Sequence, residues 1–397
     1  MKYSILFFLV SYMGLSGWAQ ADTSFNIWMW TTGKHYLHDG QTLKNYGFTL
    51  GIGTPTIPGP VLRVKQGQKV QLDVRNQSQG APHTIHLHGL DADQNNDGVP
   101  LTSWDIKHKE TKAYEFVAEH PGTYLYHCHV ASVIHVQLGM YGSIIVEPTA
   151  NEAAPGYFYG RDFNLLISEA DKSWFDNKPI HSTGDSVHAL FSIPAYEPDY
   201  FFVNGQGQQQ IDSLIMRPDE NVFLRLSNVG YFENLVKFPS SLSVRLISSD
   251  GRPLPNKTII DSLYIGAGER YGVMLSPIGK STGSIEIQYL HMFTGNRVQS
   301  EFVPYGWDES LGIETTSIYD GFQVYPNPVI DKVHISYKTD GPYQVNIIDL
   351  AGKILNSDFS IEKNEIIMDL SSHKPGVYSL QIMQNDKVVY TNSIIKM

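Results

Sequence analysis

The residues best suited to chemistry lie between positions 122 and 142. This stretch holds Cys128, the only cysteine among 397 residues, and the residue on either side of it is a histidine. His135 and Met140 follow within a few residues. Thiolate, imidazole and thioether together form the ligand set of copper, above all of the trigonal site with two His, one Cys and a weak axial Met. The stretch therefore predicts a copper site.

A second group of histidines precedes it in the segment from His83 to His88. In an extended strand, neighbouring side chains point to opposite faces. His86 and His88 therefore share one face, and His83 tends to the other. The same alternation turns Cys128 away from both of its histidine neighbours.

This parity predicts two half-sites. The first is a mononuclear copper centre, and its predicted ligands are His83, Cys128, His135 and Met140. The second gathers four imidazoles for one or more further copper ions, and its members are His86, His88, His127 and His129. Peptide bonds link Cys128 directly to two members of the second half-site. We therefore expect a short covalent route for electrons, with Cys128 and these four histidines as the catalytic residues.

Composition places the motifs in an all-β protein. Short alternating runs rich in Tyr, Phe, Val and Ile recur between Gly and Pro turn signals, as in sandwiches and barrels. The length suits two or three domains. A net charge of −11 without a basic run argues against nucleic acid as a partner.

The N-terminus predicts export. Lys2 precedes an apolar run, which ends before the small-residue segment Ala19–Ala21. This pattern predicts a signal peptide over residues 1–21, with an uncleaved membrane anchor as the alternative. A single cysteine forms no disulfide within the chain, so in an oxidising compartment a thiol held by metal is favoured.

Residues 22–150 resemble a cupredoxin domain of the multicopper oxidase family, the group of laccases and their two-domain relatives. The matching segments are Pro58–Pro60, Asn76, His83–Gly89, Asp97–Pro100 and Gly122–Val146. The resemblance implies that His83, Cys128 and His135 bind type 1 copper, with Met140 as axial ligand. It implies that the other four matched histidines belong to the type 2/type 3 cluster. The interval from Cys128 to His135 is longer than in common laccases.

Residues 151–307 resemble the metal-free middle domain of three-domain multicopper oxidases. The matching segments are Phe202–Gly205, Val222–Asn228, Ser249–Gly251 and Gly266–Tyr271. The family's full trinuclear cluster uses four His-x-His pairs, and this chain has two. Half of the usual ligands of this cluster are therefore missing from the chain.

Three functions remain open at this point. The first is an oxidase, in which a small-molecule or protein donor gives electrons to type 1 copper and oxygen is reduced at the histidine cluster. The second resembles the trimeric copper nitrite reductases, with type 2 copper held by His88, His127 and, from a neighbouring subunit, His291. The third is an electron carrier or copper-binding protein with type 1 copper alone.

The C-terminal region predicts delivery rather than catalysis. After a linker at residues 308–320, residues 321–397 resemble the C-terminal sorting domain of the type IX secretion system. The matching segments are Tyr325–Pro328, Asp349–Lys353 and Pro375–Tyr378. The resemblance implies the outer-membrane secretion machinery as a partner and passage through the periplasm to the cell surface or medium. A carbohydrate-binding or Ig-like appendage is the alternative. The predicted fold is thus two cupredoxin-like Greek-key barrels or sandwiches followed by a small β-sandwich.

Overall fold

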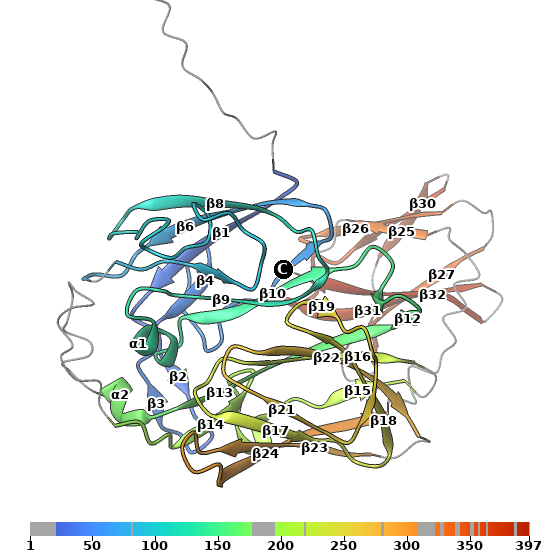
Figure 1. Ribbon diagram of the computed structural model, residues 1–397. Helices are drawn as coiled ribbons and strands as arrows, with labels where there is room; N and C mark the ends of the chain where they lie inside the picture. Colours follow the sequence, from blue (N-terminus) through green and yellow to red (C-terminus); the bar gives the residue numbers. More distant parts are fainter. Residues whose placement is uncertain are drawn as a thin grey trace, which may run out of the picture. The chain divides into compact units, whose positions relative to one another are not determined.

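A computed structural model of the chain (Figure 1) describes two ranges of residues. These are residues 21–307 except 81, 177–194, 218–219 and 279–281, and residues 322–396 except 326–328, 338–341, 350–352, 356–357, 363 and 385–386. The chain divides into two compact units, residues 1–307 and 308–397. The predicted signal peptide, apart from Ala21, and the predicted linker lie outside the described residues.

The prediction of an all-β protein is confirmed. Helix in the described residues is confined to α1 (Ser132–Gln137), α2 (Lys172–Asp176) and one 3-10 turn (Gln208–Gln210). None of the described helices has the length and apolar character needed to cross a membrane.

The first domain is a sandwich of two four-stranded sheets. One sheet has the order β4 (Gly47–Leu50), β1 (Thr23–Trp30), β6 (Lys69–Asn76), β8 (Thr111–Val117). The other has the order β5 (Leu62–Lys65), β10 (Tyr141–Glu147), β9 (Gly122–His127), β7 (His86–His88). A short hairpin joins β2 (His35–Tyr36) to β3 (Thr42–Leu43). Strand β6 alternates strictly, with Val70, Leu72 and Val74 buried, because successive side chains face opposite sides of a sheet.

The second domain repeats this architecture around a core of its own. Its larger sheet contains β14 (Tyr200–Val203), β13 (Arg161–Ala170), β16 (Val222–Asn228), β22 (Arg270–Pro277), β18 (Leu242–Ser249), β19 (Arg252–Pro253) and β20 (Ile259–Ile260). Its smaller sheet contains β15 (Leu214–Met216), β24 (Arg297–Trp307), β23 (Gly283–Leu290), β17 (Glu233–Lys237) and β21 (Ser262–Ile265). The pair β11 (Glu152–Ala154) and β12 (Tyr157–Phe158) begins the second domain in sequence.

Strand β9, which leads to Cys128, packs directly against the second domain. The Tyr124 hydroxyl accepts a hydrogen bond from Arg252 Nη1 at 2.8 Å and lies 3.3 Å from the Gly251 carbonyl oxygen. Gly122 and Gly251 approach so closely that a methyl group on Gly122 would lie 2.7 Å from the Gly251 Cα. This backbone contact holds strand β9 at a fixed distance from the second domain.

The C-terminal unit is a small sandwich with a separate core, as predicted. One sheet has the order β25 (Phe322–Tyr325), β26 (Lys332–Tyr337), β30 (Glu365–Asp369), β29 (Phe359–Glu362). The other has the order β28 (Ile354–Leu355), β27 (Gln344–Ile348), β31 (Gly376–Gln384), β32 (Lys387–Lys396).

We predict that Gly251→Ala destabilises the protein more than Gly156→Ala. Both glycines have positive φ, 75° and 82°, so each substitution carries a backbone cost of about 1–2 kcal/mol. A methyl group on Gly156 meets open space, whereas on Gly251 it would lie 2.4 Å from the buried Tyr124 ring, adding about 1–3 kcal/mol. Denaturant unfolding of both variants measures the difference, and equal losses would contradict the close contact.

Candidate metal centre

The turn after strand β9 pairs the backbones of the two predicted sulfur ligands, Cys128 and Met140. Tyr141 pairs with His127 in the β9–β10 ladder, so the next pair outward joins Cys128 and Met140. The Cys128 N–H donates to the Met140 carbonyl oxygen at 3.1 Å, and the Met140 N–H donates to the His135 carbonyl oxygen at 2.9 Å. Helix α1 begins after Ala131, whose φ of 44° is left-handed. The chain therefore folds His135 back over Cys128.

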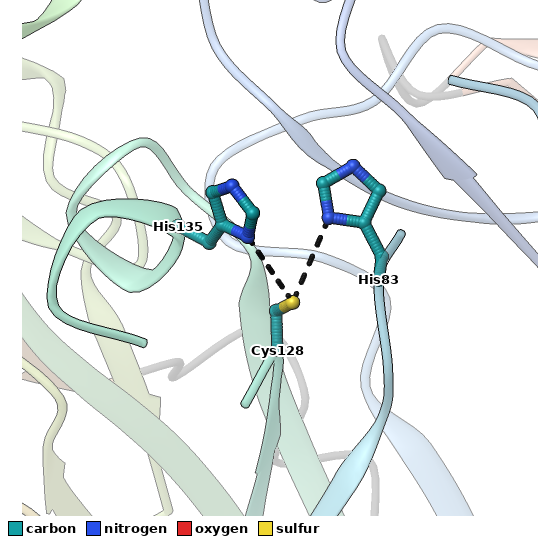
Figure 2. A group of neighbouring side chains, drawn as sticks. All are labelled: His83, Cys128 and His135. Carbon is teal, nitrogen blue, oxygen red and sulfur yellow. Dashed lines mark hydrogen bonds between the residues drawn. The ribbon is translucent and has the colours of Figure 1, made fainter. Parts of the chain in front are cut away.

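Figure 2 shows two imidazoles directed at one sulfur atom. The Cys128 Sγ lies 3.6 Å from His83 Nδ1 and 3.4 Å from His135 Nδ1. All three side chains are buried, as is Met140. Two ligand atoms that share one ion at about 2.0–2.3 Å, with a trigonal spread, lie roughly 3.5 Å apart. The three atoms thus fit a single metal ion, and their softness fits copper.

Burial keeps every member of this group neutral when no metal is bound. It raises the pKa of the Cys128 thiol to about 11 and lowers the pKa of His135 to about 4. The pKa of His83 also lies well below its ordinary value, because of burial and the neighbouring His135. The His83 Nε2 atom is buried without a hydrogen-bond partner. A cation between these groups would favour the thiolate and compensate for this desolvation.

The second histidine group forms where β7 pairs with β9. His86 lies opposite His127 in that ladder, and ligand atoms of His86, His88 and His127 all lie within 4.8 Å of one another. His88 Nδ1 is 3.3 Å from His127 Nε2. His86 Nδ1 contacts the Asp97 carbonyl oxygen at 2.7 Å, and His127 Nδ1 contacts the Cys128 carbonyl oxygen at 3.0 Å. These contacts fix both rings through Nδ1. The atoms left to bind a metal are His86 Nε2 and the His127 Nε2 that faces His88 Nδ1.

His129 lies at the edge of this group. Its ring centre is 5.2 Å from that of His86 and 6.1 Å from that of His127. The His129 N–H donates to the Thr84 hydroxyl at 2.9 Å, which ties the residue to the segment between His83 and His86. The four predicted histidines therefore come together, with three of them in closest reach of one ion.

His291 lies apart from both groups. It begins the turn between β23 and β24, where its Nδ1 accepts the N–H groups of Phe293 at 3.2 Å and Thr294 at 3.3 Å. Among the described residues it belongs to no group of three or more metal-ligating side chains. Its predicted role as a ligand for a neighbouring subunit stays a prediction.

Several residues that border the two groups are far away in the chain and were not predicted from the sequence. The Tyr46 ring lies against both His83 and His135, with ring centres 6.2 and 5.7 Å apart. In the second domain, Gly268 approaches His88 so closely that a methyl group would lie 3.0 Å from its Cε1. Arg270 is 5 % exposed and lowers the pKa of His88, which burial already depresses, to about 4. Spacing along the sequence carries no signal for such contacts.

The Arg270 guanidinium is fixed from both domains. It forms an ion pair with Asp250 at 2.9 Å and donates to the carbonyl oxygens of Gly268 at 2.8 Å and Thr123 at 3.4 Å.

A further group, Asp91, Glu119 and His120, is exposed. Asp91 in that group already pairs with Arg252, so the group is explained as surface ion pairing.

Three regions of the chain match models of known protein families. Residues 52–151 and 166–294 each match a model described as multicopper oxidase. Residues 323–397 match the secretion system C-terminal sorting domain.

Individual relatives agree with these matches. Copper resistance protein A of Escherichia coli is 28% identical over 271 residues, covering 57% of this chain and 42% of that protein. Iron transport multicopper oxidase FET3 of Saccharomyces cerevisiae is 30% identical over 280 residues, covering 68% and 40%. The chain thus spans less than half the length of these two relatives. The crystal structure of blue copper oxidase from Nitrosomonas europaea superposes with a TM-score of 0.60 at 28% identity, covering 74% of this chain and 87% of that chain.

We predict that the metal-free protein loses stability as the pH falls below about 6.5. The folded-state pKa values of His88, His127 and His135 are lowered to about 4, 3 and 4, so between these values and about 6.5 the unfolded chain binds more protons. Each histidine should cost roughly 1–2 kcal/mol at about pH 5. Denaturant unfolding after copper removal by a chelator measures this loss.

Two variants test the assignment of the pH effect to the buried rings. His127→Gln should reduce the loss between about pH 7 and about pH 5, whereas His291→Gln should leave it unchanged because that ring lies outside both clusters. A loss of equal size in wild type and His127→Gln would contradict the assignment.

Proposed function

The chain belongs to the multicopper oxidase family, and we propose that it is an exported copper-dependent oxidoreductase. It takes electrons singly from a small-molecule or protein donor and passes them to oxygen. One observation carries the proposal. Cys128 faces one half-site while its neighbours His127 and His129 belong to the other, so the two half-sites are covalently joined.

The first half-site is assigned to type 1 copper. His83, Cys128 and His135 would hold the ion, and the buried Met140 would supply a weak thioether contact. Copper contributes one-electron redox chemistry at this place. The chain contributes a dry pocket and fixed donor atoms, since all four side chains are buried and the Tyr46 ring packs against both imidazoles.

The second half-site is assigned to the binding and reduction of oxygen. His86, His88, His127 and His129 would hold the further copper. The contact between His127 Nδ1 and the Cys128 carbonyl oxygen at 3.0 Å adds a second link to the first half-site, beside the peptide bond. Asp97 fixes the His86 ring at Nδ1, through its carbonyl oxygen at 2.7 Å and its carboxylate at 3.3 Å.

A second candidate function follows from the compactness of this group. Of its four histidines, three place ligand atoms within 4.8 Å of one another, namely His86, His88 and His127. Such a set suits a single further ion. In a nitrite-reductase-like homotrimer, His88 and His127 would hold this ion together with His291 of a neighbouring subunit. An electron carrier with type 1 copper alone would leave the second group empty of copper.

Variants that remove one half-site at a time test the proposal that the protein is an oxidase. We expect Cys128→Ser to abolish the visible thiolate-to-copper band and to lower oxygen consumption with a phenolic donor or cuprous ion at least about 100-fold. We expect His88→Gln to keep the band but to lose the second copper and oxygen consumption. Copper per chain, optical and electron-spin spectra, and an oxygen electrode provide the measurements.

His291→Gln distinguishes the candidates. It should leave copper content and oxygen consumption unchanged in the oxidase, whereas in a reductase-like trimer it should remove the second copper and nitrite turnover. A wild-type protein with one copper per chain and no oxygen consumption would contradict both enzymes and support the carrier. A Cys128→Ser protein that kept the strong visible band would overturn the type 1 assignment.

Delivery is assigned to the C-terminal unit. Its match to a sorting domain and its separate core support a role as an address read by the outer-membrane secretion machinery. Copper binding is assigned wholly to the first unit, which contains every proposed ligand.

We predict that a chain ending at Trp307 keeps its copper centres but is no longer delivered. The first unit has its own cores, so copper per chain and the visible band should match those of the full chain. In cells, the truncated protein should accumulate within the cell envelope, as fractionation would measure. Equal appearance of both forms at the surface or in the medium would contradict the delivery role.

A further inference from the structure

A buried carboxyl group in the second domain lies behind the helix that carries His135. Glu169, in strand β13, is 3 % exposed. Its Oε1 accepts the Tyr196 hydroxyl at 3.0 Å and the N–H groups of Tyr231 at 2.5 Å and Phe232 at 3.2 Å. Its Oε2 is buried without a hydrogen-bond partner. An acceptor buried in this way is costly, which suggests a role beyond packing.

The two tyrosines bound to Glu169 hold helix α1 on both sides of His135. The Tyr196 hydroxyl accepts a hydrogen bond from Gln137 Nε2 at 2.8 Å. The Tyr231 hydroxyl donates to the carbonyl oxygen of Val133. Val133 and Gln137 stand two residues before and two residues after His135. The Glu169 carboxyl group thus holds both tyrosines that fix helix α1 from the second domain.

We propose that Glu169 is a positioning residue for the type 1 centre, setting the place of helix α1, and with it His135, through Tyr196 and Tyr231. The proposal rests on the assignment of His135 as a copper ligand. It gives the second domain, which supplies none of the assigned copper ligands, a defined influence on the centre. Gly230 makes the arrangement possible, since a methyl group there would lie 2.0 Å from Glu169 Oε2.

Ionisation of Glu169 changes the strength of its hydrogen bonds to Tyr196 and Tyr231. Burial raises its pKa to about 7, and the titratable groups that face it are the hydroxyls of Tyr141, Tyr196, Tyr231 and Tyr289. Burial raises the pKa of each tyrosine, so all four stay neutral near pH 7. Above about pH 7 the carboxylate is charged, and hydrogen bonds to a charged acceptor are the stronger ones. Below about pH 7 the carboxyl is neutral and the contacts to both tyrosines weaken.

The test compares Glu169→Gln with Glu301→Gln in the copper-loaded full chain. Glu301 is a matched control, because it is also buried with a raised pKa in the second domain, but its hydrogen bonds go to Gln208 and Gln299. We expect the reduction potential and electron-spin spectrum of type 1 copper in wild type and Glu301→Gln to change with pH around a midpoint near about 7. In Glu169→Gln, both quantities should keep, at every pH, the values that wild type shows at low pH. A Glu169→Gln protein that titrates like wild type, or a wild type without pH dependence, would overturn the proposal.

A metal-free measurement separates this proposal from the function proposed above. In the protein without copper, Glu169→Gln should speed hydrogen exchange of the α1 amides roughly 2- to 10-fold for each weakened contact, and Glu301→Gln should not. Tyr196→Phe and Tyr231→Phe each remove one link and should each give part of the effect, even if Glu169→Gln fails to fold. Unchanged α1 exchange in both tyrosine variants would overturn the proposal whether or not copper binds.

Discussion

The arrangement of the proposed copper ligands depends on one feature of backbone pairing, the register of strand β9 with its two neighbours. The pairing of His127 with His86 places two imidazoles side by side on one face. One residue further, the Cys128 N–H donates to the Met140 carbonyl oxygen, and the sulfur faces the other side. Because side chains alternate at every residue, a slip of one position would exchange the two faces. Both half-sites therefore require the same register.

This dependence explains which parts of the site could be predicted from the sequence. The division of ligands between two faces follows from strand periodicity, which needs no knowledge of the fold. The choice of copper follows from the donor atoms. The all-β class and the small C-terminal sandwich follow from alternation and turn residues. In contrast, Tyr46, Arg270 and Glu169 reach the site only through contacts between distant segments. Side-chain spacing does not encode such contacts, so sequence reasoning could not find these residues.

The second domain supplies none of the assigned copper ligands, yet it borders both half-sites. Next to the histidine group, Gly268 allows close approach to His88, and Arg270 places a fixed positive charge held by Asp250. Next to the type 1 group, Tyr231 reaches helix α1 from the Glu169 side. Buried charged groups require fixed partners, so Arg270 and Glu169 make the packing between the two domains specific. The second domain therefore acts on the centre by position and by charge.

The protonation of the ligands also indicates how the centre is assembled. The Cys128 thiol has a pKa of about 11 and the His135 imidazole a pKa of about 4, and burial lowers the pKa of His83 well below its ordinary value. All three groups are therefore neutral at ordinary pH. The first domain can therefore fold around these groups without burying a charge, unlike small metal domains that are unfolded without their ion. Loss of the Cys128 proton would then accompany copper binding. The donor atoms are already held in place by the fold, so the contacts that position helix α1 would also position His135 toward a bound ion.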